Sequence, residues 1–171
     1  MVRLGSVVLI SVVIGVAAWC MWPLPALPSD AKADLVVVRK AAHRLELYRA
    51  GVLLKSYAVS LGRHPTGPKR RQGDGRTPEG EYRLDYREAD SSFYRALHIS
   101  YPGPADLAAA RSEGIDPGGS VMLHGMKNGF GWLGRIHLAV DWTDGCVAVT
   151  DREMDEIWRA VPDGTKIVLT P

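Results

Sequence analysis

Hydrophobic and polar residues alternate in several short stretches of the chain, and this period of two is typical of half-buried β-strands. In residues 44–48, for example, Leu45 and Leu47 flank the charged Glu46. Ala50-Gly51 supplies a tight turn into the next such stretch, so we expect a meander of antiparallel strands. Strand character is found at residues 35–38, 44–48, 52–61, 81–85, 96–100, 121–123 and 166–169, and the last of these is expected to close the sheet.

Two segments carry helical signals instead. Residues 150–153 read Thr-Asp-Arg-Glu, the spacing of a capping box, and apolar residues then recur at three- and four-residue steps until Pro162. Residues 104–113 are predicted to form a second short helix, because Pro104 suits a first helical turn. Residues 62–80 are dense in Gly, Pro, Lys and Arg and are predicted to form a loop near the substrate. Together these patterns predict a mostly β domain with one or two short helices.

The N-terminal part of the chain has a different pattern. Residues 4–22 form an apolar run without charge, and about 19 such residues can span a bilayer as a helix. We expect a hydrophobic helix within residues 1–22 to act as an export signal or membrane anchor. An anchor is favoured, although residues 31–33, Ala-Lys-Ala, fit a signal-peptidase site. Residues 23–33 contain three prolines and are predicted to be a linker, followed by one domain at 34–171.

Composition narrows the class of protein. The chain has 171 residues, enough for one globular domain with its own core. Its 21 Lys and Arg against 19 Asp and Glu leave a net charge of +2, too small to indicate nucleic acid as the principal ligand. Of the two cysteines, Cys20 lies in the apolar run, so the domain holds Cys146 alone and no internal disulfide. An unpaired thiol outside the cytoplasm is expected to be either buried or used.

The neighbours of Cys146 favour its use. It follows Gly145 at a sharp turn, where backbone N–H groups can converge on one point as an oxyanion hole. The thiolate is the reactive form of cysteine and needs a nearby base. His124, at the end of a predicted strand, lies 22 positions earlier (146 − 124), and His137 lies 9 positions earlier (146 − 137) in a stretch, 136–138, that resembles a strand. We rank His124 first as the base.

Simpler interpretations compete with this one. A lone cysteine is often a small buried apolar residue, and a histidine at a strand end is often only hydrogen-bonded. A zinc site built from His124, His137, Asp144 and Cys146 has suitable residue types, but the spacings match no familiar short-range ligand motif. We therefore expect no metal. The basic residues of the 62–80 loop are either solvated or attract acidic polymers and carboxylates.

Two segments of the chain together resemble a known signature. Leu123-His124-Gly125 followed by Thr143-Asp144-Gly145-Cys146 resembles the catalytic motif of the L,D-transpeptidase (YkuD-like) domain family, in which a histidine segment precedes a Ser/Thr-x-Gly-Cys segment. The resemblance extends to residues 45–48, 59–62 and 73–80 and thus covers the domain from Asp34 onward. It implies a β-sandwich or barrel with one or two short helices.

The resemblance also implies a reaction. Cys146 would attack the carbonyl of the third, diamino-acid residue of a peptidoglycan stem peptide, forming a thioester and releasing the terminal D-alanine. His124 would accept the thiol proton, the Gly125 carbonyl would orient the imidazole, and N–H groups at Gly145 and Cys146 would hold the oxyanion. No metal or organic cofactor is implied. Substrate contacts are expected from Thr143, Asp144, Trp142, His137, Trp132 and Arg76.

Two features depart from the common family pattern. Asp144 stands where many members carry His, and Val147-Ala148 follow the cysteine where many carry Arg or Asn. An Asp144 carboxylate facing the sulfur would disfavour the thiolate, so we expect it to point towards a histidine, an arginine or backbone donors. The Asp-Gly-Cys form resembles a subgroup linked to cutting existing cross-links as well as to making them. Hydrolysis by the same Cys/His site, of cross-links or of anchored proteins, is therefore one alternative, and a non-catalytic wall-binding module is another.

The implied partners and location follow from the family and the N-terminal segment. Peptidoglycan stem peptides are the expected substrate, the membrane is a partner if the N-terminal segment stays uncleaved, and no nucleic acid is expected. We expect a monomer in the cell envelope, on the periplasmic side, either anchored or secreted after cleavage. The residues leave open transfer versus hydrolysis and the identities of donor and acceptor.

Overall fold

The computed structural model describes residues 25–171, so the hydrophobic helix predicted within residues 1–22 lies outside the described residues. None of the helices within 25–171 combines the length and hydropathy that crossing a bilayer requires. The elements of this part of the chain are β1 (Leu35–Arg39), β2 (Arg44–Arg49), β3 (Val52–Ala58), β4 (Gly80–Ser91), β5 (Tyr94–Ile99), α2 (Pro104–Glu113), β6 (Met122–His124), the 3-10 helix η1 (Gly131–Ala139), β7 (Val147–Ala148), α3 (Asp151–Ala160) and β8 (Thr165–Thr170).

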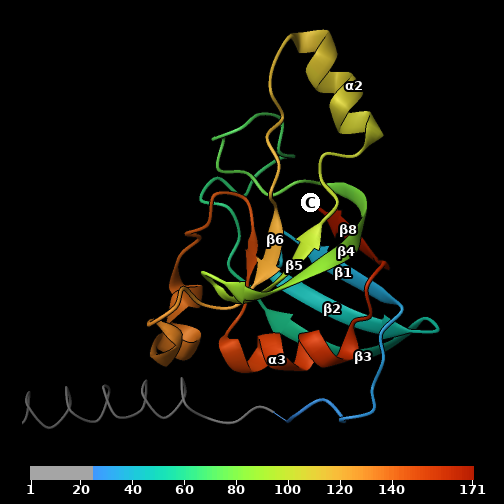
Figure 1. Ribbon diagram of the computed structural model, residues 1–171, viewed down its shortest axis with the longest axis vertical. Helices are drawn as coiled ribbons and strands as arrows, with labels where there is room; N and C mark the ends of the chain where they lie inside the picture. The colour runs from blue at the N-terminus through green and yellow to red at the C-terminus, as the bar shows by residue number, and fades with distance from the viewer. Residues whose placement is uncertain (1–24) are drawn as a thin grey trace, which may run out of the picture.

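The eight strands of the described chain form one curled sheet, in the order β3-β2-β1-β8-β4-β5-β6-β7 (Figure 1). β1, β2 and β3 form the expected antiparallel meander. β8 pairs with β1 in parallel and with β4 antiparallel, so the stretch expected to close the sheet lies in its middle instead. Helix α3 carries the chain from β7, at the edge of the sheet, to β8, which lies between β1 and β4. The mostly β fold with a few short helices agrees with the prediction.

Helix α3 packs its apolar face against the sheet and lies below it in Figure 1. The side chains of Met154 and Ile157 are completely buried, and each such burial is worth about 1.5–3 kcal/mol. Thr150 accepts the backbone N–H of Glu153 and forms the capping box that the sequence pattern predicts. Because β7 is separated from α3 by only two residues, this cap also fixes the position of the segment that follows Cys146.

Residues 25–33 were expected to form a linker, and the structure docks them on the domain. Leu27 is 5% exposed and belongs to the hydrophobic core. The Ala33 N–H donates to the Ala160 carbonyl at 2.8 Å, and the Lys32 ammonium donates to the Arg159 carbonyl at 2.6 Å. This described part of the predicted linker therefore lies along the end of α3 and is not a free spacer.

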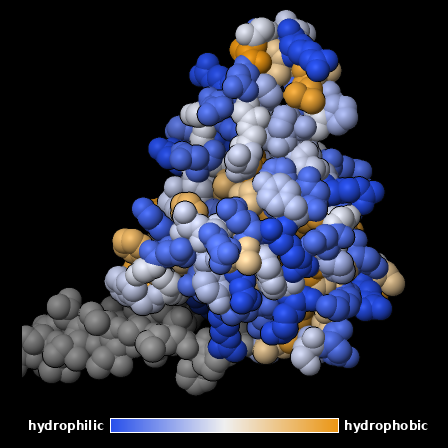
Figure 2. Space-filling model, in the orientation of Figure 1, coloured by the Kyte–Doolittle hydropathy of each residue, from blue (hydrophilic) through white to orange (hydrophobic). Residues whose placement is uncertain are grey.

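Helix α2 forms at the residues expected but contributes little to the core. Ala110 is its one buried residue, and Gly114, in the left-handed conformation, ends it. Residues 101–120, which we call the arm, carry α2 away from the sheet (Figure 1), and hydrophobic and hydrophilic residues lie side by side at its tip in Figure 2. The arm lies against the 62–80 loop, because the Gln72 N–H donates to the Asp116 carbonyl at 2.9 Å. Arm and loop thus face each other above the sheet.

The prediction of strand character at 136–138 was wrong, because these residues belong to η1. Gly134 has φ 48° and ψ −129°, outside helical values, and joins two short helical turns. An alternation over three residues is too short to define a period, and glycines at 131 and 134 make tight turns accessible. As a consequence His137 is buried, at 5% exposed, and does not face solvent from a strand.

Candidate active site

Cys146 ends a tight turn, residues 143–146, immediately before β7. The Thr143 hydroxyl donates to the Cys146 carbonyl at 2.8 Å and accepts the Gly145 N–H at 3.1 Å. The backbone of Thr143 is in turn hydrogen-bonded to Leu61 and Arg63. Thr143 was expected to contact substrate, but it is 4% exposed and its hydroxyl is used within the turn. Its observed role is to hold the backbone of the cysteine in place.

Glycine is required at position 145 by two observations. Its φ of +130° is rarely adopted by residues with a side chain, and a Cβ there would lie 2.5 Å from the carbonyl oxygen of Arg76. The 62–80 loop therefore packs directly on the turn that carries Cys146. The Gly145 N–H, expected at the oxyanion hole, already donates to Thr143.

The thiol of Cys146 is partly exposed. Its Sγ accepts the N–H of Met122 at 3.4 Å and lies 3.9 Å from the Ser120 carbonyl oxygen. Burial raises the pKa of the thiol above its usual value; the Met122 hydrogen bond opposes this and the charge of Asp144 adds to it. The sulfur is consequently protonated at neutral pH in the free protein.

His124 is the last residue of β6, the strand beside β7. The parallel register pairs Leu123 with Val147 and His124 with Ala148, so one step earlier Met122 lies beside Cys146. Alternate residues of a strand point to the same face, and His124, two residues after Met122, therefore shares a face with Cys146. Strand spacing puts their Cα atoms about 8 Å apart, within reach of an imidazole and a thiol. The sheet itself thus brings together the two residues that the sequence singled out.

The hydrogen bonds of His124 fix where its proton lies. Its Nδ1 is 2.6 Å from the carbonyl oxygen of Gly125, which can only accept, so Nδ1 carries the hydrogen. The side chain is 3% exposed, and burial lowers the pKa of the imidazole to about 4, although the Gly125 bond opposes the shift. At neutral pH the ring is uncharged and Nε2 has a free lone pair. This is the state that a general base needs before reaction.

Aromatic rings enclose His124. The ring of Phe93 lies 4.7 Å from it, and that of Trp142 lies 5.8 Å away, edge-on. Trp142 also stands edge-on to His137 at 6.4 Å and donates its indole N–H to Nδ1 of His137 at 3.4 Å. Trp142 and His137 were predicted to contact substrate, and the structure places both beside the base.

His137 differs from His124 in the position of its proton. The indole N–H of Trp142 can only donate, so Nδ1 of His137 accepts and the hydrogen lies on Nε2. Ser60 lies 3.1 Å from the same Nδ1 and also contacts the His137 carbonyl. Burial, and then the neighbouring His124, lower the pKa of His137 to about 4. Among residues 25–171, Nε2 of this ring has no hydrogen-bond partner.

The other predicted contact residues lie on different sides of the turn. The Asp144 carboxylate is exposed and forms an ion pair with Arg63, so it does point towards an arginine as expected. Arg76 lies in the 62–80 loop, with its backbone against Gly145. Trp132 projects from η1 with 76% of its surface exposed, and no hydrogen bond or ring contact within the described chain joins it to the histidines or Cys146. The structure does not bring Trp132 into the site.

Asp151 was missed in the sequence and has a structural role beside His124. It is the first residue of α3, and its carboxylate accepts the Met126 N–H at 2.7 Å. A Cβ at position 125 would lie 2.8 Å from the same carboxylate, which explains the glycine after His124. The capping-box pattern placed Asp151 at a helix start, but nothing in the pattern indicated a contact with a residue 26 positions earlier (151 − 125).

Within residues 25–171, no group of three or more His, Cys, Asp or Glu side chains is placed to hold a metal ion.

The family follows from comparison of the whole domain. The model of the YkuD family, the L,D-transpeptidase catalytic domain, matches residues 33–169. The chain belongs to this family. YafK of Escherichia coli strain K12, for which L,D-transpeptidase activity is proposed, is 32% identical over 111 residues, which are 64% of this chain and 37% of YafK.

Solved structures share the L,D-transpeptidase-like fold. The helical cell shape determining protein Pgp2 of Campylobacter jejuni has a TM-score of 0.62 at 21% identity, covering 82% of this chain and 48% of Pgp2. Bd1075 of Bdellovibrio bacteriovorus has a TM-score of 0.58 at 19% identity, covering 85% of this chain and 50% of Bd1075. This chain thus spans half or less of the length of these relatives, and the likeness to the two structures concerns the fold alone.

Proposed function

We propose that this protein is a cysteine-dependent L,D-transpeptidase that acts on peptidoglycan stem peptides through a thioester. The observation that carries the proposal is the tautomer of His124: Nδ1–H is tied to the Gly125 carbonyl, so the basic Nε2 belongs to a neutral ring on the same sheet face as the Cys146 thiol. The family match supplies the substrate class. A subgroup assignment based on Asp144 remains a prediction.

The proposed first half-reaction begins with an uncharged pair. Because the pKa of Cys146 is raised and that of His124 is lowered to about 4, neither group is ionised at rest. As Sγ attacks the stem-peptide carbonyl, Nε2 of His124 takes the thiol proton. The tetrahedral intermediate then collapses, the C–N bond to the terminal D-alanine breaks, and the imidazolium returns the proton to the leaving amine. The product is a thioester on Cys146.

The second half-reaction reverses the proton movements. An acceptor amine attacks the thioester, His124 removes its proton, and the sulfur leaves and recovers a proton. For the oxyanion of both half-reactions we assign the Cys146 N–H, since the Gly145 N–H is engaged by Thr143. Water in place of the amine gives hydrolysis with the same residues, which is the main alternative outcome.

We further propose that the protein acts in the cell envelope, on the periplasmic side. Support comes from the apolar run at residues 4–22 and from the location of the proposed substrate. Whether the segment is cleaved does not alter the chemistry of the Cys146 site.

The test uses the full-length protein and muropeptides with tetrapeptide stems. Mass spectrometry should detect a covalent adduct on the peptide that contains Cys146 and then newly joined stems. Shortened stems without joined products would instead identify a hydrolase. Cys146→Ala should form neither adduct nor product, whereas Cys20→Ala, the other cysteine, should behave like the unmodified protein. Absence of any adduct on Cys146 would contradict the enzyme and favour a wall-binding module.

A further inference from the structure

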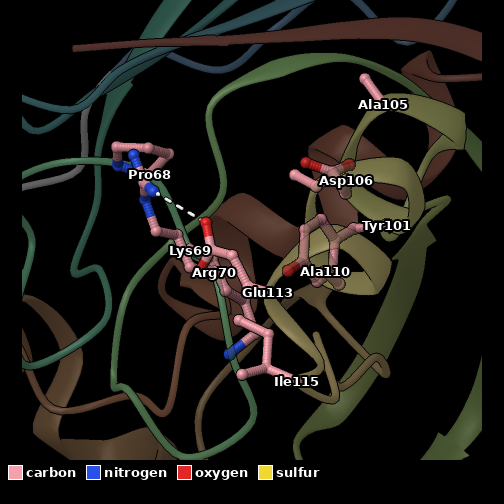
Figure 3. Close-up of a pocket in the computed structure, with 10 residues that line it drawn as sticks. Pro68, Lys69, Arg70, Tyr101, Ala105, Asp106, Ala110, Glu113 and Ile115 are labelled. Atoms are coloured by element: carbon pink, nitrogen blue, oxygen red, sulfur yellow. Dashed lines mark hydrogen bonds and ion pairs between the residues drawn. The ribbon is translucent and has the colours of Figure 1, made fainter.

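A basic pocket of about 810 Å³ lies between the 62–80 loop and the arm. Four of its lining residues are arginines, Arg63, Arg70, Arg71 and Arg76, and two are acids, Asp74 and Glu113. Figure 3 shows the smaller adjoining hollow, in which the ion pair between Arg70 and Glu113 joins loop to arm. The large pocket therefore has an excess of two positive charges (4 − 2) among these groups.

The positive charge of the pocket is not cancelled by its own protein partners. Arg63 pairs with Asp144, and Arg70 pairs with Glu113. The side chains of Arg71 and Arg76, in contrast, have no hydrogen bond or ion pair to any residue of the described chain; the hydrogen bonds of these two residues use their backbone atoms. Both arginines line the pocket, and neither guanidinium has an acceptor within residues 25–171. Each offers several N–H donors in a planar arrangement that suits a carboxylate.

Asp74 does not supply the missing negative charge, because it is used to shape the loop. Its carboxylate accepts backbone N–H groups of Arg70, Arg71 and Arg76 and the Lys69 ammonium. Burial would raise the pKa of Asp74, but these hydrogen bonds outweigh it and lower the pKa to about 2. A buried ammonium, Lys40, ties the same loop to β1 through Gly67 and Thr77 carbonyls. The arginines are therefore presented from an ordered backbone.

The pocket adjoins the turn that carries the thiol. The Arg63 N–H donates to the Thr143 carbonyl at 3.0 Å, and the Arg76 carbonyl occupies the space beside Gly145. An anion held by Arg71 and Arg76 would thus be bound by the same loop that packs against the residue before Cys146.

We infer that this pocket is a carboxylate-binding subsite, in which Arg71 and Arg76 hold the anionic part of an acidic peptide whose acyl carbonyl reacts at Cys146. Identifying that peptide as the donor stem rests on the proposed function; the anion selectivity of the pocket does not. The subsite supplies the carboxylate recognition that Val147-Ala148, lacking a charged side chain, do not provide.

The first test compares two alkylating agents that differ in charge. Iodoacetate and iodoacetamide transfer the same group to Cys146 with loss of iodide, but only iodoacetate carries a carboxylate. We expect the ratio of their rate constants (iodoacetate over iodoacetamide) at Cys146, followed by peptide mass spectrometry, to fall roughly tenfold in Arg71→Gln/Arg76→Gln. The control Arg44→Gln/Arg159→Gln removes two exposed charges elsewhere and should leave the ratio nearly unchanged. An equal fall in both double variants would indicate net charge alone and overturn the subsite, as would no fall in either.

The second test measures binding without any reaction. A stem tripeptide with free carboxylates, titrated calorimetrically into the full-length protein, should bind at least about tenfold more tightly than the same peptide with its carboxylates amidated, and Arg71→Gln/Arg76→Gln should abolish this preference. Equal binding of both peptides overturns the subsite even if Cys146 forms thioesters. A retained preference without thioester formation would instead leave the subsite standing and refute the proposed enzyme.

Discussion

The two sides of the turn that carries Cys146 differ in charge and in burial. On the β6 side, His124 and His137 are buried among aromatic rings, and burial keeps both uncharged. On the loop side, Arg63 and Arg76 carry permanent charges, next to solvent, on a backbone that Asp74 organises. The difference separates two tasks: proton transfer benefits from a base without charge or hydration, whereas recognition of an anion needs fixed charge that water can reach.

Removing the base should produce the largest effect on the histidine side. In His124→Ala the thiol loses its proton acceptor, so we expect the rate of Cys146 acylation to fall by roughly 10²- to 10⁴-fold with little change in substrate affinity. His98→Ala is the matched control: this histidine lies opposite Met122 on the neighbouring strand β5, but its side chain contacts Asp85 and Tyr86, and no contact within the described chain joins it to His124 or Cys146. Single-turnover mass spectrometry measures the rate. A comparable loss in both variants would show that general destabilisation, not base catalysis, is responsible.

Displacing the turn at residues 143–146 should have the second-largest effect on the acylation rate. Gly145→Ala forces a Cβ against the Arg76 carbonyl, and a displacement of about 1 Å at a reacting group can cost on the order of 100-fold in rate. Gly51→Ala shares the positive φ, at +77°, but has open space around its Cβ. Urea unfolding and acylation of both variants separate backbone strain from displacement. Equal acylation by Gly145→Ala and Gly51→Ala would mean that the loop and the turn adjust to each other freely.

The pH dependence tests the uncharged state of the histidine side. A base with a pKa of about 4 stays neutral down to about pH 5, so the acylation rate at pH 5.5 should remain close to that at pH 7. A histidine at its usual pKa of about 6.5 would cost about tenfold over the same range. Nitrogen-15 NMR of the imidazoles gives an independent readout, with His124 neutral and protonated on Nδ1 at pH 7. An acid limb near 6.5 would contradict the buried base.

Replacing the second histidine should have a moderate effect. His137→Leu removes the acceptor of the Trp142 N–H, and the loss of one hydrogen bond of about 1 kcal/mol corresponds to about fivefold in rate if it loosens the ring beside His124. His137→Gln, which can keep an acceptor there, should recover part of that loss. The NMR titration of His124 reports whether its pKa also moves. If His137→Leu changes neither the acylation rate nor the pKa of His124, His137 only packs within η1 and does not support the base.

The smallest effect is expected at Trp132. It is 76% exposed and, within residues 25–171, has no hydrogen bond or ring contact with the histidines or Cys146, so Trp132→Ala should change the acylation rate by less than about twofold. Trp142 also lies between the two motifs, but its ring contacts both histidines. Trp142→Ala should therefore lower the acylation rate clearly more than Trp132→Ala does. Similar losses in the two variants would restore Trp132 as a substrate contact.

The sequence pattern predicted the features that depend on neighbouring residues. Strand alternation, the Thr150 cap and the Pro104 helix start are local, and each is found in the structure. The motifs also singled out Cys146 and His124; the structure places His124 at the end of β6 and Cys146 immediately before the neighbouring strand β7.

What could not be predicted depends on contacts between distant segments. Nothing in the alternation of residues 166–169 distinguishes a central strand from an edge strand, because that choice is made by partners elsewhere in the chain. The contact of Asp151 with Gly125 and that of Arg76 with Gly145 likewise appear only when the sheet is assembled. At residues 136–138 the alternation predicted a strand, but the glycines at 131 and 134 permit the tight turns of η1 instead.

The central position of β8 has a consequence for how the molecule assembles. Within the described chain, the ladders of β1–β3 and of β4–β7 are connected through β8, and only isolated bridges, Ser60 with Ala148 and Gly62 with Thr143, join the two halves elsewhere. The pairing of Lys166 with Leu35 spans 131 positions (166 − 35). Until that strand inserts, the half with the nucleophile and the half with the meander have no ladder in common. Sequence-distant pairings of this kind slow folding, so this domain should fold more slowly than a domain of similar size with mostly local pairings.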